Sequence, residues 1–335
     1  MLKFIGRIVK LVLVVIIAFV VFVIWDNHRI KIVEQEIHIE ALPGQLEGFR
    51  ILQVSDLHEK EFGKNQRRLI KKINSIDYDV LVFTGDMMDE INSTNYEAVY
   101  SIIEGIENKQ MMLYVPGNAD PYSYEIEPSF GKSDFIKGME ERGVTLLESV
   151  ASLEVEGSAV HFVEFELAII KRPEFVSETE GIVQPPYVVD PQFMAHHKKL
   201  WEEMTLLDDT DPSDVVIALN HYPVVDNRID FIKDEPIHFW REFDLIMAGH
   251  YHGGQIRLPF KGAIFVPEAW YESGGIFPPE NRVKGLWEYE GTKQYVSTGL
   301  GSSDAISFLN FRLFNPPEIN VVELVRQRAS ELPPE

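Results

Sequence analysis

The chain has 335 residues, of which 45% are apolar and 25% are charged. This composition excludes a disordered, collagen-like or disulfide-stapled protein. Because the sequence contains no Cys, it has no disulfide, no thiolate metal site and no Cys nucleophile. The net charge is −22, with 31 Lys and Arg against 53 Asp and Glu. So acidic a protein repels phosphate backbones, which argues against nucleic-acid binding as its main function.

The first segment of the chain is predicted to be a transmembrane helix. Fifteen apolar residues run from Leu11 to Trp25 without a break. As a helix, residues 8–25 are about 27 Å long, close to the ~30 Å hydrocarbon core of a bilayer. A buried core helix would be amphipathic, whereas this segment is apolar all round. A signal peptide needs small residues at its cleavage site, and this run ends in VFVIWDNH. Cleavage is the main alternative to an uncleaved anchor.

Basic residues before the apolar run predict the orientation of the chain. Lys3, Arg7 and Lys10 precede it, and the positive-inside rule therefore places the N-terminus in the cytoplasm. The prediction is a single-pass protein of the cell membrane whose large domain lies outside the cytoplasm. Its parts would be an anchor over residues 1–30, one domain over residues 31–325 and a polar tail over residues 326–335.

Beyond the anchor, strand and helix patterns alternate. Helices are predicted at 65–76, 96–108 and 191–204, the last within an otherwise irregular stretch, 166–213. The predicted strands are 28–41, 50–56, 79–86, 111–118, 144–148, a hairpin at 151–165, then 214–221, 243–250, 254–259, 293–301 and 318–325. Strand–helix repeats of about 30 residues predict an α/β fold with parallel strands. The carboxyl ends of such strands lie along one edge, where α/β sheets place their sites.

Side chains able to bind metal ions follow five of these strands. The segments are Ser55-Asp56-Leu57-His58, Gly85-Asp86, Gly117-Asn118-Ala119-Asp120, Asn220-His221 and Gly249-His250-Tyr251-His252. Each fragment alone is weak, because a lone Asp-x-His or Gly-Asp is usually a turn. Together they offer imidazole, carboxylate and amide groups without sulfur, a donor set that suits Mn, Fe or Zn. Two metals about 4 Å apart need a bridging anionic ligand, and Asp86 can provide it.

In order and spacing, these motifs resemble the signature of the calcineurin-like metallophosphoesterases over about residues 50–325. The run AGHYHGGQIRLP, followed by YVSTGLG and PPEIN, is similar to their membrane-associated bacterial branch. That branch includes phosphodiesterases and pyrophosphatases acting on UDP-2,3-diacylglucosamine. The resemblance implies a four-layer α/β/β/α sandwich and two divalent metal ions. It also implies the metal ligands, namely Asp56, His58, Asp86 and His252 for the first ion and Asp86, Asn118, His221 and His250 for the second.

The implied activity is hydrolysis of a phosphodiester or pyrophosphate in a phosphorylated small molecule or lipid head group. The implied nucleophile is a hydroxide bridging the two ions. One position departs from the family: its usual G-N-H-[DE] reads Gly-Asn-Ala119-Asp120, so only the carboxylate of the catalytic pair is present. Ala cannot transfer a proton, and a general acid is typically worth about 10²–10⁴-fold in rate. The alternative is therefore a catalytically weak metal-binding protein that binds a phosphorylated ligand or partner.

Other segments receive simpler interpretations. His196 and His197 are expected on the surface of the helix at 191–204, and the acidic run at 208–214 is expected to be a solvated loop. Met87-Met88 and Met111-Met112 are expected to fill the core. The aromatic stretch 269–279 either lines a substrate groove or touches lipid, or else it packs on the surface.

Overall fold

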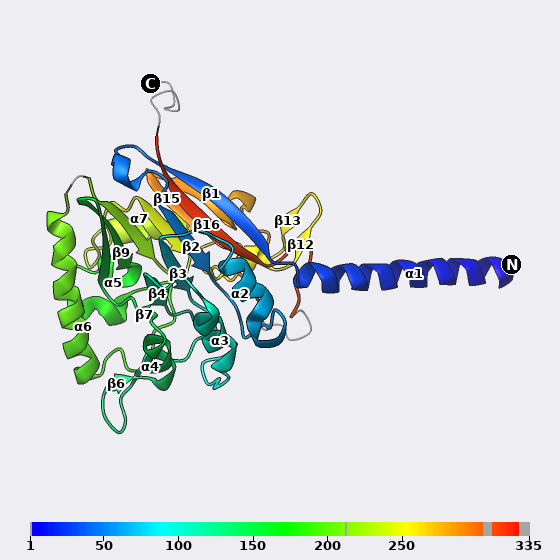
Figure 1. Cartoon of the computed structure of the whole chain (residues 1–335), viewed down its shortest axis with the longest axis horizontal. Helices are drawn as coiled ribbons and strands as arrows, with labels where there is room; N and C mark the ends of the chain where they lie inside the picture. The colour runs from blue at the N-terminus through cyan, green and yellow to red at the C-terminus, as the bar shows by residue number, and fades with distance from the viewer. Residues whose placement is uncertain (1, 212, 304–309, 328–335) are drawn as a thin grey trace.

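Two six-stranded β-sheets form the centre of the protein (Figure 1). The computed structural model describes residues 2–211, 213–303 and 310–327. In spatial order the first sheet contains β1 (Lys31–Ile39), β16 (Glu318–Arg326), β2 (Arg50–Val54), β3 (Val80–Thr84), β4 (Met112–Val115) and β7 (Thr145–Leu146). The second contains β14 (Gly285–Tyr289), β15 (Thr292–Val296), β11 (Leu245–Ala248), β10 (Val215–Leu219), β9 (Ser158–Glu164) and β8 (Val150–Val155).

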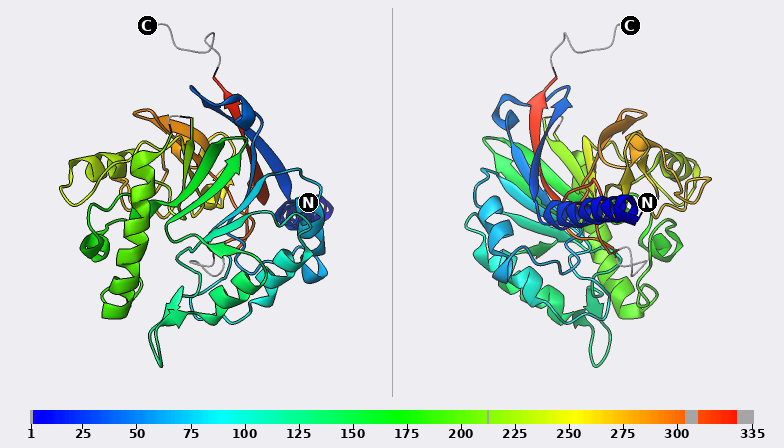
Figure 2. Two further views of the ribbon diagram at one scale, coloured as in Figure 1. Left: turned by 60° about the vertical axis from the view of Figure 1, so that its left-hand side comes forward. Right: turned by 90° about the vertical axis from the view of Figure 1, so that its right-hand side faces the viewer.

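Helices cover the outer faces of both sheets (Figure 2). The helices on the first sheet are α2 (Arg67–Ile73), α3 (Glu97–Gly105) and α4 (Asp134–Glu141). Those on the second are α5 (Phe165–Ala168), α6 (Pro191–Glu203) and α7 (Asp226–Asp234). Short 3-10 helices are η1 (Gly44–Leu46), η2 (Lys64–Gln66), η3 (Pro173–Glu178), η4 (Met204–Asp209), η5 (His252–Gly254) and η6 (Glu280–Arg282). Two small hairpins pair β5 (Tyr124–Glu125) with β6 (Gly131–Lys132), and β12 (Arg257–Leu258) with β13 (Gly262–Ala263).

Alternation of side chains along the strands accounts for the layers. On β3, Val80 and Val82 pack between the sheets, whereas Leu81 and Phe83 pack against the helices of the first sheet. Successive side chains of a strand point to opposite faces, so a strand that is apolar throughout must be covered on both sides. The expected four-layer α/β/β/α sandwich is confirmed.

The helix α1 (Leu2–Asn27) projects from the domain and touches it only near its C-terminal end (Figures 1 and 2). Its residues Lys3–Asn27 are long and apolar enough to cross a membrane, and the most apolar 18-residue window among them has a mean hydropathy of 3.2. None of the most apolar stretch is buried in the protein, which excludes a core helix. The segment predicted to span the membrane, 8–25, lies within α1.

Several expectations about the fold were wrong in detail. The strand–helix repeats predicted parallel strands, but β16 runs antiparallel to β2, and β14 runs antiparallel to β15. The hairpin predicted at 151–165 is confirmed, because β8 and β9 pair antiparallel. The stretch 254–259 does not close a main sheet; its β12 pairs only with β13. Most of the predicted polar tail, 328–335, lies outside the described residues.

The expectation of two surface histidines on α6 was wrong for His197, whereas His196 stays partly exposed. His197 is only 6% exposed and packs against the ring of Phe193. His196 is partly buried and its Nε2 lies 2.7 Å from the hydroxyl of Tyr124. The reason is that α6 lies across the β5 segment rather than in solvent. The described residues of the run 208–214 are exposed or half-buried, and both Met87 and Met88 are buried, as expected.

Candidate metal centre

The side chains singled out in the sequence meet where the two sheets bring their carboxyl ends together. Asp56, Asp86 and Asn118 follow β2, β3 and β4, which are neighbours in the first sheet. His221 follows β10, and His250 and His252 follow β11, its parallel neighbour in the second sheet. A hydrogen bond of 2.8 Å from Gln53 Nε2 to the carbonyl of Ala248 ties the two sheets together just below this edge.

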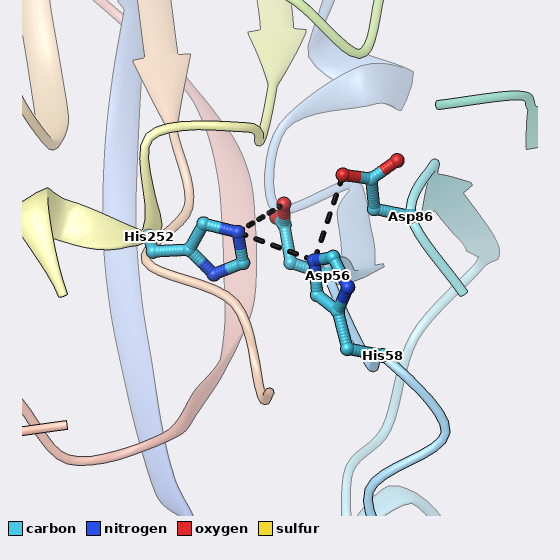
Figure 3. Close-up of side chains that lie close together, drawn as sticks. All are labelled: Asp56, His58, Asp86 and His252. Atoms are coloured by element: carbon cyan, nitrogen blue, oxygen red, sulfur yellow. Dashed lines mark hydrogen bonds and ion pairs between the residues drawn. The ribbon is translucent and has the colours of Figure 1, made fainter. Parts of the chain in front are cut away.

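A first cluster contains Asp56, His58, Asp86 and His252 (Figure 3). One potential ligand atom from each of the four lies within 4.8 Å of the others. His58 Nε2 is 3.2 Å from His252 Nε2 and 3.5 Å from Asp86 Oδ2. Two imidazole nitrogens facing each other beside carboxylates form a compact set of electron-pair donors.

A second cluster contains Asp86, His221 and His250. His221 Nε2 lies 3.2 Å from Asp86 Oδ2 and 3.1 Å from His250 Nδ1. The other ring nitrogen of His221, Nδ1, is 2.9 Å from the carbonyl of Thr84. This contact fixes the ring so that Nε2 points into the cluster, a common arrangement for a metal-binding His.

Asp86 belongs to both clusters, and Asn118 lies beside them. Asp86 Oδ2 is the atom that approaches both His58 and His221, while its Oδ1 accepts a hydrogen bond of 2.7 Å from the amide of Ala119. The Oδ1 atom of Asn118 is buried and has no hydrogen-bond partner among the described residues. An unpaired buried amide oxygen costs free energy unless something else binds it, and a divalent cation fits that requirement.

The backbone of this region has an unusual conformation. Five residues of the clusters have positive φ angles between 46° and 67°, where residues other than Gly are uncommon: Asp56, His58, Asp86, His250 and His252. Such strained residues concentrate at functional sites, where the surrounding structure holds them.

Glycines make the close packing of these loops possible. A Cβ atom at Gly117 would lie 2.2 Å from Asp86 Oδ1, and one at Gly249 would lie 2.5 Å from Asp56 Oδ2. Any other residue at these positions would displace a carboxylate of the first cluster.

Burial and charge shift the pKa values of the clustered groups in different directions. Burial raises the pKa of Asp56 to about 6. Burial also opposes a charge on His221, but the Asp86 carboxylate outweighs it and raises the pKa of His221 to about 9. Burial and the neighbouring His221 lower the pKa of His250 to about 3. Without metal, the site therefore holds a proton on His221 to balance Asp86, and a cation that binds there must displace that proton.

A cavity of about 680 Å³ opens beside the clusters. Its walls include the cluster residues His58, Asp86, His250 and His252, together with Asn118 and Ala119. Apolar side chains form another part of the wall: Ile91, Ile256, Ile264, Phe265 and Pro267. The aromatic stretch predicted at 269–279 does not line this cavity; Trp270 and Tyr271 pack on an apolar cluster beside α7.

Asp120 is buried beside a different cavity from the one that Ala119 lines. Asp120 is 2% exposed, and its two carboxylate oxygens accept hydrogen bonds from the amides of Gly117 at 2.9 Å and Met88 at 2.8 Å. It borders a smaller cavity of about 170 Å³, on the side of Tyr122. Asp120 thus holds the loop that carries Asn118, and its catalytic role stays a prediction.

The sequence did not single out Arg312, although it supports the site. Its guanidinium is fully buried and donates a hydrogen bond of 3.1 Å to the carbonyl of His252. Asn315 Nδ2 donates to the same carbonyl at 2.6 Å. No local sequence pattern marks either residue. Both lie in an irregular segment, and their side chains bind the backbone carbonyl of a residue distant in the sequence.

Comparison with known proteins agrees with this geometry. The sequence model of the calcineurin-like phosphoesterases matches residues 49–254, more than half of the chain. The chain belongs to this family. As a metallophosphoesterase it is a phosphoric ester hydrolase, and the family generally uses a pair of divalent metal ions.

Two bacterial relatives of this metallophosphoesterase align over most of their length. An uncharacterized metallophosphoesterase, YkuE of Bacillus subtilis, is 25% identical over 89% of this chain and 87% of its own. The UDP-2,3-diacylglucosamine pyrophosphatase LpxG of Chlamydia muridarum is 25% identical over 96% of this chain and 98% of its own. Among solved structures, the phosphopantetheinyl hydrolase PptH of Mycobacterium tuberculosis aligns over 76% of this chain and 91% of its own, with 15% identity and a TM-score of 0.40.

Proposed function

We propose that this metallophosphoesterase hydrolyses a phosphodiester or pyrophosphate at a centre of two divalent metal ions. The observation that carries the proposal is the position of Asp86, whose Oδ2 faces His58 in one cluster and His221 in the other. A carboxylate shared by two ligand sets is the arrangement that holds two ions close together. Asp56, His58, Asp86 and His252 would hold the first ion, and Asp86, Asn118, His221 and His250 the second.

The chemistry expected of the centre follows from its ligands. Two divalent cations bound there would lower the pKa of a bound water and neutralise charge on the phosphoryl oxygens. The protein supports this by fixing the ligands: Thr84 orients His221, and the amide of Ala119 holds Asp86. N and O donors without sulfur favour Mn, Fe or Zn in the pair.

The proposed substrate is an amphiphilic phosphoester with an apolar part. The cavity beside the clusters places the metal-binding residues at one wall and Ile256, Ile264 and Phe265 at another. Such a mixed lining accommodates a phosphorylated head group together with an acyl chain. The pyrophosphatase LpxG, named for a diacylated nucleotide sugar, aligns over 98% of its length and supports this class.

A second candidate rests on Ala119. This residue lines the cavity directly after Asn118, where a side chain able to donate a proton is usual in the family. Without a general acid, the protein would bind metal and a phosphorylated ligand yet turn over slowly.

One experiment separates the two candidates. The full chain is purified in detergent, loaded with Mn and tested on a nitrophenyl phosphodiester, on UDP-2,3-diacylglucosamine and on the same nucleotide sugar without acyl chains. The proposal expects metal-dependent turnover that is lost in Asp86→Asn, with a lower KM for the acylated pyrophosphate. Two bound metal ions without turnover of any of the esters would favour the binding protein.

We further propose a single-pass topology with the N-terminus in the cytoplasm and residues 31–325 as the domain outside it. Lys3, Arg7 and Lys10 at the start of α1 support this orientation. Protease added to intact protoplasts should digest the domain. Digestion only after lysis would reverse the topology, and a soluble, shortened product in the medium would indicate cleavage of α1.

A further inference from the structure

The C-terminal end of α1 is embedded in the domain. Asp26 and Asn27 are only 2% and 7% exposed. Asn27 Nδ2 donates to the carbonyl of Arg312, and the amide of Arg312 donates back to Asn27 Oδ1, both at 2.7 Å. Since the helix runs directly into these contacts, no flexible linker separates it from the domain.

This junction fixes where the domain sits relative to a bilayer that α1 spans. The 26 residues of α1 are about 39 Å long, longer than the ~30 Å hydrocarbon core. The exposed ring of Trp25 near its end is the kind of side chain that lies at the lipid head groups. The domain surface around Asn27 is therefore held within the head-group region.

Exposed apolar side chains gather beside this junction. Outside α1, five Phe residues are strongly exposed among the residues that the structure describes, and four of them lie in or next to the β12–β13 hairpin. We call the following set the hairpin patch: Leu258, Phe260, Phe265, Ile276, Phe277 and Phe314. Phe260, at the tip of the hairpin, is fully exposed, with a relative accessibility of 108%.

Direct contacts connect the hairpin patch to α1. The amide of Arg257 in β12 donates to the carbonyl of Leu313 at 3.0 Å, and the ring of the next residue, Phe314, packs in a tilted arrangement on Phe22 of α1, with 5.6 Å between ring centroids. Lys261 Nζ lies 6.0 Å from the centroid of the Phe277 ring, so Phe277 lies close to the tip of the β12–β13 hairpin. Figure 1 shows β12 and β13 at the end of the domain from which α1 projects.

We infer that the hairpin patch docks into the membrane surface beside α1. Its aromatic and aliphatic side chains would enter the boundary between head groups and acyl chains, and Lys261 would reach lipid phosphates. Continuity with α1 favours a bilayer over a protein partner, because the same junction that holds α1 holds the hairpin. Apolar insertion rather than charge must drive the contact, since the net charge of the chain is −22.

Docking of the patch has a consequence for the cavity. Ile256, Ile264 and Phe265 belong to the hairpin segment and also line the cavity of the metal clusters. A docked hairpin therefore opens this cavity at the membrane surface, where an amphiphile enters without crossing water. The docking itself depends on α1 spanning the membrane and not on the reaction proposed above.

The absence of Cys from the chain allows a direct test. Single-Cys variants of the full chain are labelled with a nitrobenzoxadiazole dye and reconstituted in phosphatidylcholine vesicles. Phe260→Cys reports on the hairpin tip. Phe239→Cys, an exposed Phe outside the patch, is the matched control, and Val14→Cys in α1 is the positive control. Each label is exposed to lipid carrying a doxyl quencher on its acyl chain and, separately, to aqueous iodide.

The expected result is that lipid-borne doxyl quenches the label at 260 at least about threefold more than the label at 239, with iodide showing the reverse order. Equal iodide quenching at 260 and 239 would place the hairpin in water and overturn the inference. Shielding of 260 from both quenchers would mean that protein, such as a second copy, covers the patch, and would also overturn it. A label at 14 that doxyl does not quench would show that α1 does not span the bilayer. This outcome would overturn the inference at its premise, and it is distinguishable from a hairpin patch that stays in water beside a spanning α1.

Discussion

The guanidinium of Arg312 donates a hydrogen bond to the backbone carbonyl of His252. The same side chain donates to the carbonyls of Thr298 at 2.6 Å, Gly301 at 2.5 Å and Asn315 at 2.7 Å. Because the backbone of Arg312 also binds Asn27, the end of α1 and a candidate metal ligand are joined through one buried residue.

The first prediction concerns this residue. Arg312→Lys should lower the free energy of unfolding by about 2–4 kcal/mol, because an ammonium group cannot replace the planar fork and leaves buried carbonyls unpaired. Arg326→Lys is the matched control, since Arg326 is exposed and its side chain donates one hydrogen bond, to the carbonyl of Leu42. Thermal unfolding of both variants in detergent measures the difference. Equal melting temperatures would contradict the role assigned to Arg312.

The second prediction concerns the shared carboxylate. Asp86→Ala should abolish binding of both metal ions and reduce kcat/KM by more than about 100-fold, because even outer-shell changes typically cost 10–100-fold. Glu90→Ala, which alters an exposed residue of the same cavity, should keep both ions. Elemental analysis after dialysis against Mn counts the ions per chain. Two tightly bound ions in the Asp86 variant would exclude the bridging assignment.

The third prediction is a pH dependence of stability set by His197. Burial, with a smaller contribution from His196, lowers the pKa of His197 to about 4. Between pH 6.5 and 4 the unfolded chain binds a proton at this residue and the folded chain does not, so acidification destabilises the fold. His197→Leu removes this loss of stability.

The measurement is a comparison of wild type and His197→Leu at two pH values. The variant should gain stability relative to wild type by about 2 kcal/mol on going from pH 7.5 to pH 4.5. Subtracting the pH-induced change in the free energy of unfolding of wild type from that of the variant cancels the titration of other groups, including those of the metal clusters. A stability difference that does not change with pH would mean that His197 is protonated as easily in the fold as in water.

Much of the candidate centre was predictable because its residues follow strands. Asp56, Asp86 and Asn118 come directly after apolar runs, and parallel neighbours bring their ends to one edge. The same pattern identified His221, His250 and His252 on the second sheet. That two sheets meet at this edge came only from the family resemblance, since polarity patterns do not specify which strands pair.

The parts that the sequence did not predict depend on contacts between distant segments. Arg312 pairs with Asn27 across 285 positions of the chain, and no local pattern marks either residue. His197 is buried because α6 packs on the β5 segment, where Phe193 of α6 contacts both Tyr124 and His197, and helix periodicity alone does not show this contact. The reversed direction of β16 relative to β2 likewise depends on the path of the chain through its last segment.

The last prediction concerns Ala119. If a proton donor to the leaving group is missing, wild type should hydrolyse nitrophenyl esters better than alkyl esters, because a nitrophenolate departs without a proton. Ala119→His should raise turnover of alkyl esters at least about tenfold and change nitrophenyl esters little. The cavity beside residue 119 has room for the ring, and the backbone amide that holds Asp86 is retained.

Ala119→Asn, similar in polarity but unable to donate a proton from a titrating group, is the control for this prediction. Initial rates on both ester classes, with metal content measured in parallel, give the answer. Equal rates of wild type on both classes would indicate another acid, such as Tyr122, and a slower His variant would indicate that the cavity needs a small side chain at this position for a different ligand.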